Sequence, residues 1–188
     1  MKFYKLIYDY ENDDNYINCS KVNLKRVNEY TVCNGTYVNE WEKDIIFDYD
    51  PKEANIKTDY IGNVYGWLIV SKRFRDVTKM LIEDSIQYLD VGIRDISNKN
   101  IDISYRIANV IDVVDAIDLK RSKYDEFDLG DEKVFSFEKY VLKEIVIAGH
   151  HIFKLKDDEI PTFVSEKIKN LIQVNNLTGF KFLEVEVY

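Results

Sequence analysis

The chain has 188 residues, of which 46% are apolar, and its 34 acidic and 26 basic side chains give a formal net charge of −8. This size suits one domain with a hydrophobic core, and the acidic excess argues against nucleic acid or an anionic membrane as a partner. A cationic protein is a compatible partner, although an acidic surface can also serve solubility alone. With two prolines and no Gly/Ser-rich linker, residues 1–188 are predicted to form a single domain.

The N-terminal segment predicts a strand, because residues 3–10 alternate apolar and polar side chains. It lacks the long apolar core and the cleavage site of a signal peptide. No apolar run in the chain reaches the roughly 18 residues of a membrane helix. Cys19 and Cys33 are the only cysteines. Together these features predict a cytoplasmic protein with two free thiols.

Residues 11–56 are polar and rich in Asn, and they predict either short strands or a well-packed loop. An acidic stretch at residues 44–50 lies close to several aromatic residues. Acids beside exposed aromatics can bind a basic protein surface, although such a stretch is more often a solvated loop. The aromatic anchors of this hypothesis are Tyr37, Trp41, Phe47 and Tyr49.

A segment of the chain occurs twice, at residues 66–93 and 161–187. The copies align without a gap on Ser71 and Ser165 (165 − 71 = 94 residues). Each copy predicts a strand, then a helix that begins after the aligned serine, then a second strand. Gly179 either ends the second helix or forms the turn beyond it. Two copies are too few for a solenoid, so the repeat predicts an internal duplication.

Residues 105–112 are β-prone and predict a central strand, which residues 113–118 either continue or leave by bending. Asp112, Asp115 and Asp118 are spaced by three. On a helix they would share a face and could hold Mg²⁺ or act as acid and base. The surrounding Val, Ile and Ala instead favour a strand and a bend, with the aspartates in turns and local hydrogen bonds.

The C-terminal half alternates strands and turns. Residues 120–133 are charged and predict a loop, and residues 134–137 predict a short strand. Residues 140–148 are apolar and rich in β-branched side chains. Residues 151–155 predict another strand, and residues 156–159 a polar turn. The sum is an α+β chain with mixed or antiparallel sheets and two short helices, which come from the repeated strand-helix-strand unit.

His150 and His151 are the only histidines. Adjacent residues of a strand point to opposite faces, so the pair cannot share one metal ion there. Neither cysteine has a recognisable catalytic context, and no phosphate-binding loop, dinucleotide fingerprint or nucleophile elbow occurs. The sequence therefore predicts no catalytic residue, no metal and no cofactor.

Three pieces of the chain resemble one known family. They are Tyr105-x-x-x-Asn109-Val110-x-Asp112-x-x-Asp115-Ala-x-Asp118, then Gly149-His-His-Ile-Phe153-Lys-Leu155, and Val164-Ser165-Glu-Lys-Ile168 running into Leu177-Thr-Gly179-Phe-x-Phe182-x-x-Val185. In order and spacing they resemble the immunity proteins of bacterial polymorphic-toxin systems. The resemblance covers roughly residues 66–188, and the first repeat departs from it by having Asp84-Ser85 where the second has Thr178-Gly179.

The resemblance implies a non-catalytic, cytoplasmic protein that binds a cognate toxin domain and blocks it. A basic, nuclease-like toxin would fit the acidic surface. The alternatives are a metal-dependent enzyme that uses the Asp and His residues above, and a general protein-binding adaptor. The candidate partner-binding residues are Tyr37, Trp41, Asp44, Asp48, Asp50, Asp157, Asp158 and Glu159.

Overall fold

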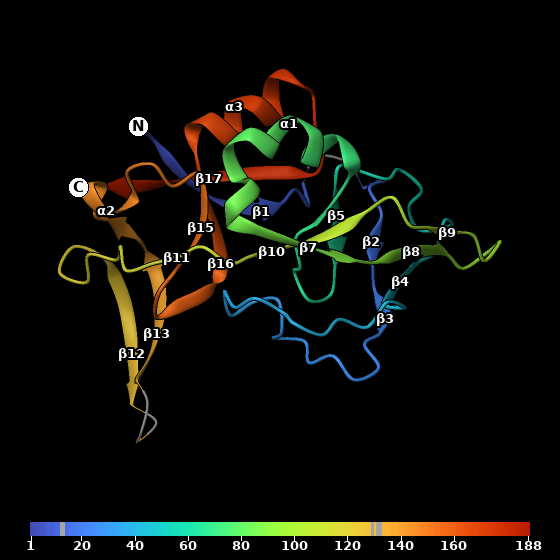
Figure 1. Ribbon diagram of the computed structural model, residues 1–188, viewed down its shortest axis with the longest axis horizontal. Helices are drawn as coiled ribbons and strands as arrows, with labels where there is room; N and C mark the ends of the chain where they lie inside the picture. Colours follow the sequence, from blue (N-terminus) through green and yellow to red (C-terminus); the bar gives the residue numbers. More distant parts are fainter. Residues whose placement is uncertain (12–13, 129, 131–132) are drawn as a thin grey trace.

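The computed structural model describes residues 1–11, 14–128, 130 and 133–188. Strands dominate it and form sheets of six, five, four and two strands. Helices α1 (Lys72–Ile82) and α3 (Glu166–Val174) pack side by side on one side of the molecule (Figure 1). The sheets are mixed and the helices are few, as predicted.

The five-stranded sheet has the order β2-β5-β6-β10-β7. Its strands are β2 (Asn18–Cys19), β5 (Tyr60–Asn63), β6 (Ile69–Val70), β10 (Arg106–Val110) and β7 (Ile86–Asp90). β2 is parallel to β5, and the other neighbours are antiparallel. β10 lies inside this sheet, which confirms the interior strand predicted at residues 105–112.

The six-stranded sheet has the order β11-β15-β16-β1-β17-β14. Its strands are β11 (Val113–Val114), β15 (Ile152–Leu155), β16 (Asp158–Ser165), β1 (Phe3–Tyr8), β17 (Phe180–Val187) and β14 (Val141–Leu142). β11 is parallel to β15 and β14 to β17, whereas the other neighbours are antiparallel. The first strand of the chain therefore pairs with the last.

Five strands of the two sheets correspond one to one. β2-β5-β6-β10-β7 and β11-β15-β16-β1-β17 share both the order and the parallel or antiparallel sense of every pair. The register also agrees. One residue of β10 lies opposite both Val70 and Asp90, and one residue of β1 lies opposite both Val164 and Glu184. These are the pairs that the 94-residue offset aligns, so β1 takes in its sheet the place that β10 takes in the other.

Two smaller sheets and two short helical turns complete the chain. The four-stranded sheet has the order β3 (Lys21–Asn23), β4 (Ile46–Tyr49), β8 (Gly92–Asp95) and β9 (Ile101–Asp102). The two-stranded sheet is β12 (Lys123–Asp128) with β13 (Lys133–Lys139), and the helical turns are η1 (Glu83–Ser85) and α2 (Glu144–Ile147). Residues 11–56 contribute β2, β3 and β4 and are otherwise irregular, as predicted, while Asn12 and Asp13 lie outside the described residues.

The predicted helix starts are confirmed. α1 begins after Ser71, whose hydroxyl accepts a hydrogen bond from the Phe74 amide at 3.1 Å, as an N-cap does. α3 begins after Ser165, but the hydroxyl of this serine contacts Nδ1 of His151 at 2.9 Å instead. Gly179, with φ of +88°, forms the turn before β17 and does not end α3.

The buried faces of the two helices meet the two large sheets in one core. Phe74 and Ile82 of α1 and Ile168 and Ile172 of α3 are buried there beside Val164 of β16. Each such side chain contributes about 1.5–3 kcal/mol on burial. A second core under β4, β6 and β8 surrounds Trp67, and a third joins β11, β14, β15 and β16. The predicted single domain and internal duplication stay predictions.

Three predictions about secondary structure differ from the structure. Residues 120–133, predicted as a loop, contain β12, although positions 129, 131 and 132 lie outside the described residues. β12 exists because it pairs along its length with β13, which extends beyond the predicted strand at residues 134–137. Residues 140–148 hold β14 and α2, so the described chain has three α-helices and not two. The turn predicted at residues 156–159 is shorter, because β16 already begins at Asp158.

Candidate functional site

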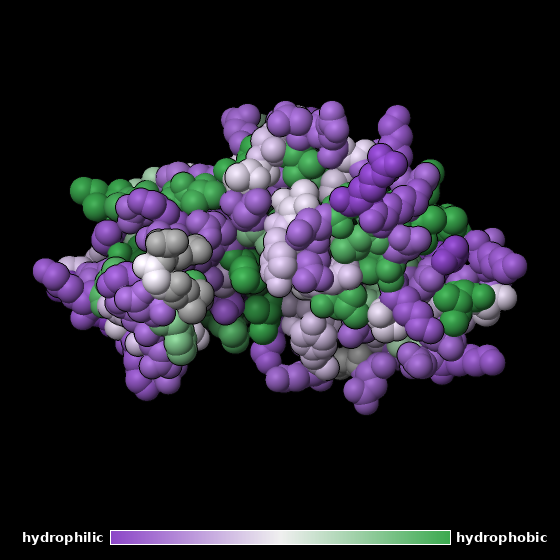
Figure 2. Space-filling view, turned by 90° about the horizontal axis from the view of Figure 1, so that it is seen from below, coloured by the Kyte–Doolittle hydropathy of each residue, from purple (hydrophilic) through white to green (hydrophobic). Residues whose placement is uncertain are grey.

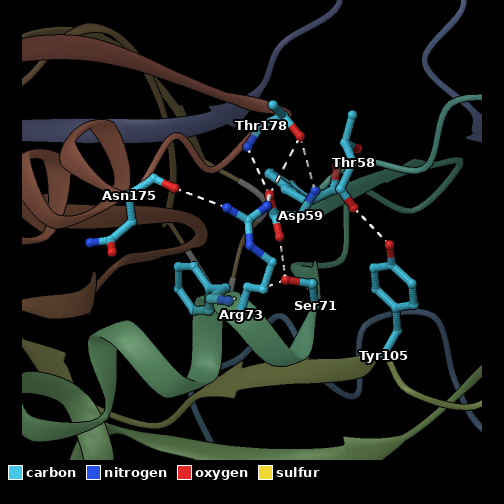
Figure 3. Close-up of polar contacts among 9 residues, drawn as sticks. Thr58, Asp59, Ser71, Arg73, Tyr105, Asn175 and Thr178 are labelled. Carbon is cyan, nitrogen blue, oxygen red and sulfur yellow. Dashed lines mark hydrogen bonds and ion pairs between the residues drawn. The ribbon is translucent and has the colours of Figure 1, made fainter.

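A buried carboxylate lies where the two repeats meet. The side chain of Asp59, 6% exposed, accepts a hydrogen bond from the Ser71 hydroxyl at 2.6 Å. Its other oxygen accepts from a guanidinium nitrogen of Arg73 and from the backbone amide of Thr178, both at 3.0 Å (Figure 3). Arg73 also donates to the carbonyl of Asn175 at 2.9 Å. This network ties the start of α1 to the segment after α3.

The same network orders the entry to β5. The phenol of Tyr105 donates to the Thr58 carbonyl at 2.9 Å (Figure 3). The amide of Tyr60 donates to the Thr178 carbonyl at 3.1 Å. Both oxygens of Asp59 are occupied by donors of the chain itself. The arrangement therefore serves as a structural brace. Sequence reasoning singled out Ser71 but missed Asp59, because an isolated Asp in a polar stretch carries no periodic signal.

The three aspartates of the enzyme hypothesis do not converge. Asp112 contacts Nδ1 of His150 at 2.7 Å. Asp115 lies 3.5 Å from the ammonium of Lys156, and Asp118 pairs with Arg121 at 2.8 Å. The bend that separates them confirms the strand-and-bend alternative. Each carboxylate is thus held by its own local partner.

The two histidines also have separate environments. His150 contacts Asp112, whereas His151 contacts the buried hydroxyl of Ser165. Burial, together with the nearby Lys167 and His150, lowers the pKa of His151 below its ordinary value. Within the described ranges, no group of three or more His, Cys, Asp or Glu side chains could hold a metal ion.

The acidic stretch at residues 44–50 is only partly free at the surface. Arg94 donates two hydrogen bonds to Asp48 at 2.7 and 2.8 Å, and Asp50 accepts from the amide of Lys52 at 2.9 Å. Asp44 is exposed and pairs with Lys25 at 2.8 Å, which holds the pKa of this carboxyl below its usual range. Phe47 and Tyr49 were predicted to be exposed aromatic anchors. This prediction was wrong, because both side chains are buried in the core.

Tyr37 is the most exposed candidate aromatic residue, at 62%. The loop that carries it is fixed on both sides. The carbonyl of Thr36 accepts from Asn109 of β10 at 2.9 Å, and Val38 exchanges two hydrogen bonds with the side chain of Gln87 of β7. Trp41, in contrast, is half-buried and donates to the backbone of β7. The structure thus presents Tyr37 on a firm support and turns Trp41 inward.

A cleft of about 320 Å³ opens beside Asp44. Its walls include Ile46, Ile101, Ile103 and Arg106, and Ile103 is well exposed. An acid at the rim of an apolar cleft suits the stem and charge of a partner's Lys or Arg side chain.

The second acidic segment, residues 157–159, runs from the turn after β15 into the first two residues of β16. Asp157 is exposed with φ of +71°. Asp158 accepts from the phenol of Tyr140 at 2.6 Å, and burial raises the pKa of its carboxyl. The backbone carbonyl of Glu159 accepts from the ammonium of Lys154 at 2.6 Å, and burial lowers the pKa of this lysine to about 8. The two acidic segments belong to different sheets.

The candidate catalytic groups are dispersed, and Tyr37, Asp44 and Asp157 are exposed. The model of the immunity protein family (Imm11) matches residues 7–187, and the chain belongs to this family. The resemblance seen in the sequence is confirmed, and the match also includes most of the N-terminal third. A search of curated proteins finds no match.

Among the residues that the structure describes, no helix has the length and apolar character needed to cross a membrane.

Proposed function

We propose that this chain binds its cognate toxin domain in the cytoplasm and inhibits it by occlusion, without chemistry of its own. The observation that carries the proposal is the match to the immunity protein family over residues 7–187. Two further observations support it. The carboxylates and histidines that could serve catalysis have separate local partners. The net charge of −8 would also steer a basic protein into encounter.

The contact surface in this proposal includes Tyr37, Asp44 and Asp157, which are exposed. The space-filling view from below shows a largely hydrophilic face with separate apolar patches between the polar side chains (Figure 2). A polar rim around small apolar anchors is the usual anatomy of a specific interface. The remaining candidates add negative charge or hold these three in place, and they are Trp41, Asp48, Asp50, Asp158 and Glu159.

The toxin in this proposal is basic and nuclease-like. A nuclease needs a positively charged channel for its polyanionic substrate, and an acidic inhibitor can fill that channel. Occlusion then removes substrate access without any covalent change in the toxin. This mechanism requires one inhibitor molecule for each toxin molecule.

The test is co-expression and titration with the toxin domain encoded by the neighbouring reading frame. We expect the chain to rescue cells that express this domain and to form a complex with it. In vitro, toxin activity should fall linearly with added chain and end near a ratio of one to one. Full protection at a small fraction of that ratio would instead indicate turnover, and would favour the enzyme hypothesis. No rescue and no complex, with both proteins folded, would reject the pairing.

A variant pair tests the candidate surface. Tyr37→Ala with Asp44→Ala should weaken the complex by roughly 10-fold or more, because truncated anchors lose buried contact. Asp76→Ala is the matched control, because Asp76 is also an exposed acid paired with a lysine, here Lys72 of α1. If the double variant and the control bind equally well, this surface is not the contact.

A further inference from the structure

The β12–β13 hairpin is an arm built differently from the rest of the chain. Its strands pair with each other and, in the described part of the chain, with no third strand. Figure 1 shows it extending away from the body, on the side opposite α1 and α3. β12 has six residues, so the arm reaches roughly 20 Å at the rise of a strand. An isolated hairpin is only marginally stable in water, so its persistence needs a cause.

A ladder of aromatic rings roots the arm in the core. Tyr124 contacts Phe135 and Phe137, with ring centroids 5.3 and 5.4 Å apart. Phe137 stacks on Tyr140 at 4.9 Å, and Tyr140 meets the buried Phe163 at 5.2 Å. Such pairs contribute about 0.5–1.5 kcal/mol each beyond the area they bury. The ladder therefore holds the base of the arm against the core.

The outer end of the arm carries an apolar pair that the ladder does not use. Phe127 lies opposite Val134 in the register, on the face away from Tyr124 and Phe137. The two side chains are 52% and 41% exposed. Single exposed apolar residues are common, but an exposed Phe paired with an exposed Val on a projecting pair of strands suits an interface anchor.

The charge of the arm indicates the chemistry of its partner. The strands Lys123–Asp128 and Lys133–Lys139 contain four acidic and three basic side chains, while Asp131 and Glu132 lie outside the described residues. The three bases are already held in ion pairs, Lys123 with Glu138, Lys133 with Glu126, and Lys139 with Glu186 of β17. The excess charge of the arm is therefore negative, and it complements a basic surface.

We infer that the arm binds a basic surface of the toxin domain through its described strands, Lys123–Asp128 and Lys133–Lys139. Phe127 and Val134 are the apolar anchors, and the surrounding acids guide and orient the encounter. This inference rests on the proposed function and names its main contact. The arm is separate from the surface around Tyr37 and Asp44. In this inference, that surface lies at the periphery of the contact with the toxin.

The test compares two double variants that remove exposed apolar side chains. The arm variant is Phe127→Ser with Val134→Thr, which keeps the aromatic ladder intact. The control is Met80→Ser with Val174→Thr, which removes two exposed apolar side chains from α1 and α3. Both variants should unfold at the temperature of the parent chain, since the substituted side chains are exposed. Affinity is measured by calorimetry against the toxin domain of the neighbouring reading frame.

We expect the arm variant to raise Kd by roughly 30-fold or more, the scale of a lost interface anchor, and the control to change it less than about 3-fold. Slower hydrogen exchange of the β12 and β13 amides in the complex should accompany this loss. If the parent chain binds and rescues while the arm variant binds equally well, the arm inference is overturned and the proposed function stands. If the parent chain does not bind, both fall.

Discussion

Replacement of Asp59 by Ala should destabilise the protein by about 3 kcal/mol. The change removes the shared acceptor of three donors, namely Ser71, Arg73 and the amide of Thr178. A buried donor left without a partner costs about 1–3 kcal/mol, which applies to Ser71. The amide of Thr178 adds about 1 kcal/mol, because solvent can replace its partner. The Arg73 pair adds about 0–1 kcal/mol, because the guanidinium is 61% exposed.

The assay is urea unfolding followed by tryptophan fluorescence and far-UV circular dichroism. In a separate thermal unfolding experiment, a loss of 3 kcal/mol should lower Tm by about 6–12 °C for a chain of this size. Arg73→Ala is the matched control and should cost less than about 1 kcal/mol, because it leaves the hydrogen bonds of Ser71 and Thr178 to the carboxylate intact. A loss below 1 kcal/mol for Asp59→Ala, or an equal loss for the two variants, would refute the hydrogen-bond reasoning.

Three further predictions follow from single residues. Gly179→Ala should lower the free energy of unfolding in urea by about 3 kcal/mol, because its φ of +88° is strained for Ala and the new Cβ would meet a carbonyl of β5. Gly66→Ala is the control. Gly66 has φ of +64° and open space around it, so this change should lower the free energy of unfolding by about 1 kcal/mol. Burial raises the pKa of Asp158 in the folded state, so its ionisation disfavours folding. The parent chain should therefore lose stability as the pH rises from the pKa of Asp158 in the unfolded chain through its raised pKa in the folded protein. Asp158→Asn should remove this loss. If the free energy of unfolding of the variant depends on pH as that of the parent does, the prediction is contradicted. Burial raises the pKa of Cys19 to about 12 and also raises that of Cys33, so a thiol reagent at pH 8 should label both far more slowly before unfolding than after it.

The sequence predicted best where one local signal agreed with the tertiary structure. The serine at the start of each repeated helix and the apolar spacing behind it placed α1 and α3 correctly. The alternation at residues 180–187 predicted β17. Its Phe180 and Phe182 pack on the core that holds both helices, and its Val185 and Val187, on the opposite face, pack on the core around Phe163. In these elements, propensity, capping and burial favour the same conformation.

The failures lie where stability comes from distant partners. β12 reads as a charged loop, because Lys123 to Asp128 has only two apolar residues, and its strand conformation depends on β13 and the aromatic ladder. Phe47 and Tyr49 look like exposed anchors beside acids, yet the pairing of β4 with β8 turns both into the core. Asp59 gains its importance from Thr178, which is 119 positions away in the chain. None of these contacts has a periodic signal in the sequence.

The correspondence of the two large sheets predicts that the chain does not fold as two separate halves. In the six-stranded sheet, the strand between β16 and β17 is β1, from the start of the chain. In the five-stranded sheet, the corresponding strand between β6 and β7 is β10, from the middle of the chain. A cut after β10 would leave β16 and β17 without the strand between them, and β1 without either partner. The interlocked strands and the Asp59 brace therefore join the two repeats through both backbone and side-chain bonds.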